Sequence, residues 1–141
     1  MKKSIVAGLL VLILGISFYL YLENNKKTTF GEAFKNGFDH KSITEITVED
    51  RQFPDKEFNL TEAQLMNIVD ETSEMKIRKV KSTPMMSYEV KILYDDKGIE
   101  KTTGFVLGYN NVLQMIDGHF YEITSPNILS EEIRKELNGM K

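Results

Sequence analysis

The 141-residue sequence contains no cysteine, and this absence excludes several ways of stabilising or anchoring a protein. Without cysteine there is no disulfide framework, no thiol nucleophile and no lipid-modified cysteine of the lipoprotein kind. The folded part must therefore be held together by side-chain packing alone. The absence fits a bacterial extracytoplasmic protein that does not rely on disulfides.

Histidine is also scarce, and its scarcity argues against an enzyme. One histidine, His40, lies in a polar connecting segment, and the other, His119, lies beside an expected hairpin turn. No serine occupies a Gly-x-Ser-x-Gly motif, and no glycine-rich phosphate loop is present. An envelope hydrolase would need His119 or the Asp95–Asp96 pair as its catalytic group. We expect His119 to be a half-exposed strand residue and predict no enzymatic activity.

Candidate ligands for a metal ion are equally few. Asp95 and Asp96 are adjacent, but neighbouring strand residues point to opposite faces, and Asp-Asp-Lys-Gly is typical of a turn. Asp117 and His119 supply two ligands without a visible third. The seven methionines lack the spacing of a copper site and are expected to fill gaps in the core. The sequence predicts no metal site and no cofactor.

Positive charge is limited beyond residue 22. That part of the chain holds all 21 acidic residues against 16 lysines and arginines, a net charge of about −5. Nucleic-acid binding depends on neutralising phosphates, so we expect no nucleic-acid partner. The same balance predicts a domain that is not built to lie on an anionic lipid surface.

A long apolar run, Ile5–Leu22, dominates the N-terminus. It carries no charge and would span about 27 Å as a helix, close to the roughly 30 Å of bilayer hydrocarbon. Lys2 and Lys3 precede the run, and aromatic residues crowd its far end. We therefore predict a single-pass signal anchor in residues 1–22, with a cytoplasmic N-terminus, an extracytoplasmic C-terminal domain and the cell membrane as first partner.

Two other interpretations of the run stay open. Gly15-Ile16-Ser17 offers the small residues that a signal peptidase prefers, so cleavage near Ser17 would give a secreted protein. That cleavage would leave an apolar, aromatic N-terminus exposed, which favours the uncleaved anchor. A buried core helix is disfavoured because a charge-free run of this length at a terminus rarely belongs to a core.

Residues 23–41 are expected to be a tether. Phe30, Phe34 and Phe38 recur every four residues and would share one face of a short helix. Such a helix would lie against the membrane or a partner, or it would fold back onto the domain as a cap. Because Gly31 and Gly37 weaken a freestanding helix, we favour the cap.

Residues 42–139 are predicted to form one α+β domain. Alternating residues indicate a strand at 42–49, Thr61 and Gln64 form a capping box for a helix at 62–74, and period-two patterns then predict an antiparallel meander. Asp117-Gly118 suggests a two-residue type I′ hairpin, and Gly104, inside a strand, suggests a bulge or a close backbone approach. Ser125-Pro126 opens the last helical region, and Ser130 is an alternative cap. The expected fold is a two-layer arrangement, a mainly antiparallel sheet with two helices on one face.

Two segments of the domain carry a resemblance to known proteins: Tyr88-Glu89-Val90-Lys91-Ile92 and Asp117-Gly118-His119-Phe120-Tyr121-Glu122-Ile123. Together with the N-terminal anchor and the closing helix, they resemble small extracytoplasmic proteins of Gram-positive bacteria of the YhfM-like kind. The resemblance covers residues 42–138. That family has no established activity, so the resemblance implies a location and a domain shape but no catalytic residue.

Function is predicted from the anchor and from the missing chemistry. The leading hypothesis is a non-enzymatic module that binds or regulates another envelope protein. The alternative is a small-ligand or cell-wall binding domain that uses an aromatic sheet face, although such residues often belong to the core. The sequence does not indicate an oligomeric state. The candidate surface comprises Tyr88, Tyr94, Tyr109, Tyr121 and His119.

Overall fold

Four helices and eight strands follow one another in the computed structural model, which describes residues 2–38, 42–53 and 56–139. In chain order they are α1 (Lys2–Asn25), β1 (Lys27–Thr29), α2 (Phe30–Gly37), β2 (Ser42–Asp50), β3 (Glu57–Leu60), α3 (Glu62–Thr72), β4 (Lys76–Val80), β5 (Met86–Asp96), β6 (Ile99–Gly108), β7 (Val112–Gln114), β8 (Phe120–Ile123) and α4 (Leu129–Gly139).

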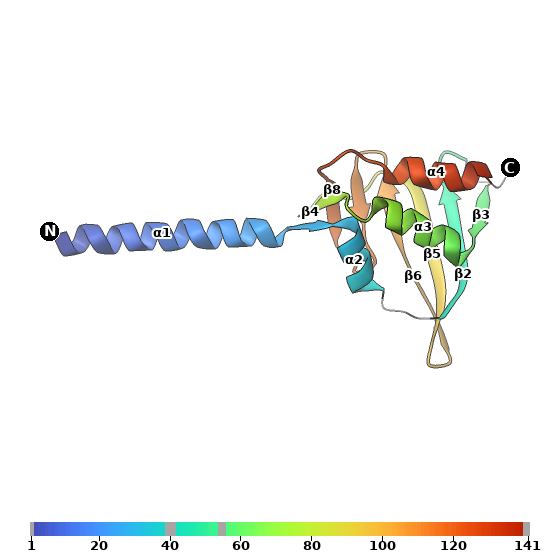
Figure 1. The fold of residues 1–141 in the computed structure, drawn as a ribbon, viewed down its shortest axis with the longest axis horizontal. Coiled ribbons are helices and arrows are strands. Elements are labelled where there is room, and N and C mark those ends of the chain that lie inside the picture. Colours follow the sequence, from blue (N-terminus) through green and yellow to red (C-terminus); the bar gives the residue numbers. More distant parts are fainter. Residues whose placement is uncertain (1, 39–41, 54–55, 140–141) are drawn as a thin grey trace.

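The strands form one antiparallel sheet in the order β1-β4-β8-β7-β6-β5-β2-β3. Helices α2, α3 and α4 cover one face of it, so the domain has two layers (Figure 1). The predicted α+β class is confirmed. Helix α2 lies on the same face beside the two helices that the sequence predicts there.

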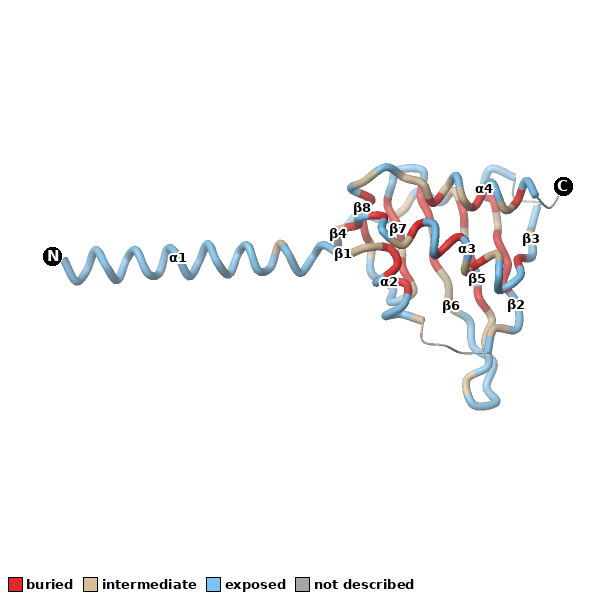
Figure 2. Tube along the Cα trace, viewed as in Figure 1, coloured by how far each residue is buried: buried red, intermediate tan, exposed pale blue. Residues whose placement is uncertain are grey.

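The hydrophobic core lies between the sheet and the three helices (Figure 2). Strand residues fill it from the sheet side, as Ile46 and Ile92 do from the paired strands β2 and β5. The helices contribute one apolar side each, for example Leu65 from α3 and Ile133 from α4, both fully buried. Burial of apolar area of this kind is the main force that stabilises such a domain.

Helix α3 begins where the sequence predicts. The backbone amide of Gln64 donates to Thr61 Oγ1 at 3.2 Å, and the amide of Thr61 donates to Gln64 Oε1 at 2.9 Å. The capping box therefore satisfies two amides that would otherwise lack partners. The predicted inner face is also confirmed, since Leu65, Ile68, Val69 and Thr72 are the buried residues of this helix.

Most of the expected tether, residues 27–38, is part of the domain, while residues 39–41 lie outside the described residues. Strand β1 pairs with β4, and the backbone amide of Phe30 donates to the carbonyl of Met75 at 2.9 Å. Phe30 and Phe34 are 0% and 2% exposed, so the favoured cap interpretation is confirmed. The boundary predicted at residue 42 is corrected to Lys27, and only Lys26 separates β1 from α1.

The turn between β7 and β8 differs from the prediction in a specific way. The type I′ turn predicted at Asp117-Gly118 is absent. Such a turn needs two positive φ angles, and Gly118 has one (81°) whereas Asp117 does not. The backbone amide of His119 instead donates to Asp117 Oδ1 at 2.9 Å. The turn with two positive φ angles lies between β5 and β6, at Lys97 (56°) and Gly98 (84°).

Helix α1 stands apart from the domain. None of its residues is buried (Figure 2), and its 24 residues give a length of roughly 36 Å. Among the described residues it is the single helix long and apolar enough to cross a membrane. Its apolar surface takes no part in the core of the domain.

Candidate interaction surface

The structure does not assemble the predicted tyrosines into one surface. Tyr88 and Tyr121 are 6% and 4% exposed and lie on the sheet face that the helices cover. Tyr94 is half-buried, and its ring meets the ring of Phe38 edge-on at 5.7 Å. Tyr109 is exposed in the turn between β6 and β7. The aromatic sheet face expected for a ligand is therefore mostly core.

The candidate acid–base residues make local structural contacts. Asp95 Oδ1 accepts the backbone amide of Gly98 at 2.6 Å, and Asp96 Oδ2 pairs with Lys101 Nζ at 2.6 Å, as turn and hairpin residues do. Within the residues that the structure describes, no three His, Asp or Glu side chains gather to hold a metal ion. His119 is exposed, and His40 lies outside the described residues.

Asp117 and Tyr121 form a partly buried polar contact beside His119. The Tyr121 hydroxyl donates to Asp117 Oδ2 at 3.1 Å. Burial, together with the charge of Asp117 and this hydrogen bond, raises the pKa of Tyr121 to about 12. A tyrosine in an unfolded chain ionises near pH 10. The folded protein therefore retains a proton between about pH 10 and pH 12 that the unfolded chain loses.

Replacing Tyr121 with phenylalanine should flatten the alkaline loss of stability. Because the folded state binds the extra proton, the free energy of unfolding falls as the pH rises through this window. Tyr121→Phe removes that contribution, so its free energy of unfolding should fall less between about pH 10 and pH 12 than that of the wild type. Urea denaturation across that range measures the difference. Tyr109→Phe, at a 67% exposed position, is the control and should follow the wild type. A Tyr121→Phe curve parallel to the wild type would contradict this assignment.

The sheet face opposite the helices carries a network of ion pairs. Arg51 Nη2 pairs with Glu89 Oε2 at 2.8 Å, and Arg51 Nη1 pairs with Glu49 Oε1 at 3.1 Å. Lys91 Nζ lies 3.7 Å from Glu49 Oε2. Glu49 and Glu89 are direct partners across β2 and β5, where two like charges would repel each other, and Arg51 bridges them.

A groove of about 380 Å³ adjoins this network along β6. Strand β6 pairs with β7 only at Val106 and Leu107, so within the described residues no strand lies beside residues 99–105 on that side. Thr102, Gly104 and Gln114 are among the residues that line the groove. Unpaired main-chain groups on such a strand edge are a template for another strand.

Gly104 brings β6 unusually close to β5. A Cβ atom at this position would overlap the carbonyl oxygen of Val90, and the φ of Gly104 is 156°. The close backbone approach predicted from a glycine inside a strand pattern is confirmed. The same approach shapes the floor of the groove, because Val90 and Gly104 both line it.

Sequence patterns missed this surface because it depends on strand register. The alternation of residues 42–49 predicts one polar face, but it does not say that Glu89 lies opposite Glu49. Arg51 follows the last residue of β2, where the alternating pattern assigns no face. Opposite charges on candidate paired strands are a signal that could have found the network.

Comparisons of this chain with protein-family models, with curated proteins and with solved structures found no match. The functional interpretation therefore depends on geometry. The ion-pair network and the groove offer charged groups, hydroxyls and main-chain hydrogen-bonding groups on one open face. That set of groups suits recognition of an extended polypeptide.

Proposed function

We propose that this chain is a membrane-anchored extracytoplasmic protein whose domain binds another envelope protein and catalyses no reaction. The observation that carries the proposal is α1: the helix is uncharged from Ile5 to Leu22, and none of its residues is buried by the domain. Since the core is complete without α1, a lipid bilayer is the natural cover for its surface. The resemblance to YhfM-like extracytoplasmic proteins supports the same location.

The open sheet face supports the binding part of the proposal. On the side away from β5, the edge of β6 is unpaired over residues 99–105, which is the length of an ordinary strand. An extended segment of the partner would pair with this edge, and the ion-pair network around Arg51 would meet its polar side chains. Main-chain hydrogen bonds would supply affinity and the side chains beside the groove would supply selectivity.

Topology is tested first, with a C-terminal tag and protease treatment of intact protoplasts. We expect the tag to remain with membranes and to be digested from outside. A tag in the culture medium would show cleavage near Ser17 instead of anchoring. A membrane-bound but protected tag would reverse the orientation inferred from Lys2 and Lys3.

The partner is tested by proximity labelling from the same C-terminus. We expect an envelope protein to be enriched, and we expect Thr102→Lys to reduce that enrichment about tenfold, because a lysine on a strand edge discourages pairing. Thr102 is exposed and lines the groove. Ala63→Lys places the same charge at an exposed position of α3 and should leave the enrichment unchanged. Equal loss in both variants, or no enriched envelope protein in the wild type, would contradict the proposed partner surface.

A further inference from the structure

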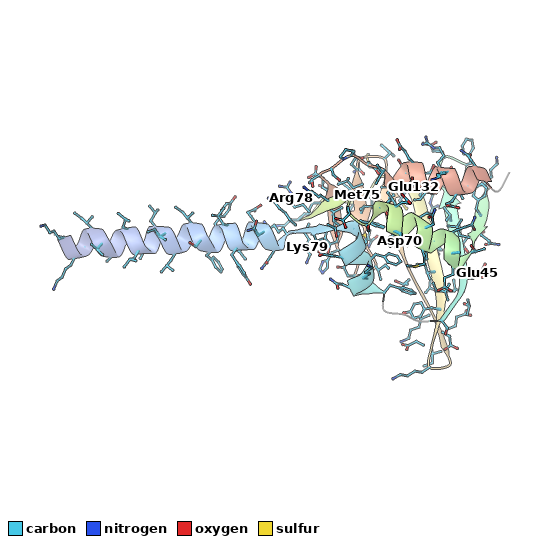
Figure 3. The ribbon with its side chains drawn as sticks, viewed as in Figure 1. Glu45, Asp70, Met75, Arg78, Lys79 and Glu132 are labelled. Atoms are coloured by element: carbon cyan, nitrogen blue, oxygen red, sulfur yellow. The ribbon has the colours of Figure 1, made fainter. Side chains whose placement is uncertain are left out.

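Basic residues gather where α1 joins the domain. Strand pairing places Lys27 opposite Arg78, and the backbone amide of Lys79 donates to the carbonyl of Lys26 at 2.8 Å. Figure 3 shows Arg78 and Lys79 beside the end of α1. We name this group the juxtamembrane basic cluster; it comprises Lys26, Lys27, Lys76, Arg78, Lys79 and Lys81.

The cluster differs from the rest of the domain, whose charge is negative overall. Composition alone predicted no affinity for anionic lipid, but it averages over charges that the sheet separates in space. Part of the cluster is neutralised, since Lys26 pairs with Glu23 at 3.1 Å and Arg78 pairs with Glu122 at 3.2 Å. The other four lysines form no ion pair with any residue that the structure describes.

A cavity of about 280 Å³ opens within this region. It lies between the end of α1, helix α2, strand β4 and the turn before β8, and its size is near the lower end of small-molecule sites, roughly 300 Å³. Two lysines, Lys26 and Lys79, and two asparagines, Asn25 and Asn36, are among its lining residues. These are donors that suit a phosphate group.

One acidic residue, Asp117, also lines this cavity, and its carboxylate is already engaged. Asp117 Oδ1 accepts the amide of His119, and Oδ2 accepts the hydroxyl of Tyr121. The remaining lining residues are uncharged: Thr28, Ala33, Gly37 and Tyr121. Two lysines and one carboxylate therefore line the cavity. Lys79 forms no ion pair with a described residue, whereas Lys26 also pairs with Glu23 outside the lining.

The depth of the cavity in a membrane follows from α1. If Ile5–Leu22 occupies the hydrocarbon layer, Asn25 lies three residues, or roughly 5 Å, beyond it. That is the level of the lipid headgroups. Lipid phosphates would therefore be present at the cavity mouth at high local concentration.

We propose that this cavity binds the phosphate of an anionic phospholipid in the leaflet from which α1 emerges. Lys26 and Lys79 contact the phosphate, the two asparagines donate to its oxygens, and the other lysines of the juxtamembrane basic cluster attract neighbouring headgroups. The bound lipid holds the domain against the membrane in one orientation. This inference rests on the membrane insertion that the proposed function includes.

Native mass spectrometry of the full chain in detergent tests the proposal. We expect one phosphatidylglycerol to be retained at least tenfold more tightly than phosphatidylcholine. The double variant Lys26→Gln with Lys79→Gln should reduce that preference at least tenfold, since each lysine near a lipid surface raises the affinity about fivefold. The matched control, Lys97→Gln with Lys135→Gln, removes two exposed lysines far from the cavity and should retain the preference. Equal retention of both lipids, or equal loss in both double variants, would overturn the site.

Two further arms separate the possible sources of failure. Inorganic phosphate that displaces the lipid at equal concentration would show a general anion site and overturn the lipid assignment. Flotation with phosphatidylcholine vesicles measures insertion of α1 independently of the cavity. Flotation without a headgroup preference would reject the lipid site alone, whereas a chain that fails to float would reject the anchor on which both proposals rest.

Discussion

Gly104→Ala should destabilise the domain by about 3 kcal/mol or more, the largest effect expected of any single methyl group added to it. The new Cβ would overlap the carbonyl oxygen of Val90 on the neighbouring strand, which is main chain and cannot rotate away. Strands β5 and β6 would have to separate in the middle of the sheet, beneath the core residues Val90 and Phe105. Urea denaturation followed by circular dichroism measures the loss.

Gly98→Ala is the matched control for this substitution. Gly98 also has a positive φ, 84°, but a Cβ there would meet no atom within 4 Å. It should therefore cost only the conformational penalty of a left-handed alanine, about 1 kcal/mol. The difference between the two variants isolates the steric part. Equal costs at both positions would show that β6 does not approach β5 as closely as the structure places it.

Phe30→Ala should cost about 3–5 kcal/mol, as expected for deleting a fully buried aromatic side chain. Phe30 is 0% exposed, and its ring meets the ring of Phe105 edge-on at 5.5 Å. The substitution therefore opens a cavity between α2 and the sheet. Phe53→Ala, at a 56% exposed position, is the control and should change the free energy of unfolding by less than about 0.5 kcal/mol.

The same pair of variants distinguishes a tether from a part of the domain. If residues 23–41 were a free tether, the Phe30→Ala and Phe53→Ala variants would unfold at the same urea midpoint. We expect instead a large shift in the midpoint for Phe30→Ala alone, measured by urea denaturation of the full chain in detergent.

Much of the fold could be predicted from local patterns. The capping box of Thr61 and Gln64 fixes the start of α3, and its four buried residues follow from helical periodicity. The meander from β5 to β8 follows from period-two alternation and turn residues. These features depend on neighbours in sequence, which is why they can be recognised without a structure.

The cap interpretation places α2 on the domain, but its close packing could not be predicted, for a physical reason. Gly31 and Gly37 indicate a weak helix, yet both are needed for close packing, because a Cβ on Gly31 would lie 2.9 Å from Ser73 Cβ and one on Gly37 would lie 2.8 Å from Ile116 Cβ. Tertiary contacts override local propensity there. Strand β1 has only three residues, too few for a periodic pattern.

The candidate surfaces were harder still to predict, because each combines residues from distant parts of the chain. Glu49 and Glu89 meet Arg51 through the pairing of β2 with β5, and Lys26 meets Lys79 through the pairing of β1 with β4. Neither register follows from hydrophobic alternation. Tyr88 and Tyr121 show the reverse case, in which an alternating aromatic pattern belongs to the core.

The single residue between α1 and β1 determines how far the domain can travel. A flexible tether of residues 23–41 would allow a root-mean-square reach of roughly 25 Å, whereas one residue spans about 3.8 Å. A domain held this closely samples a small volume, so a neighbour within that volume experiences a high effective concentration and one beyond it experiences none. Any pulling force on the domain would also pass directly into α1, with no slack chain to absorb it.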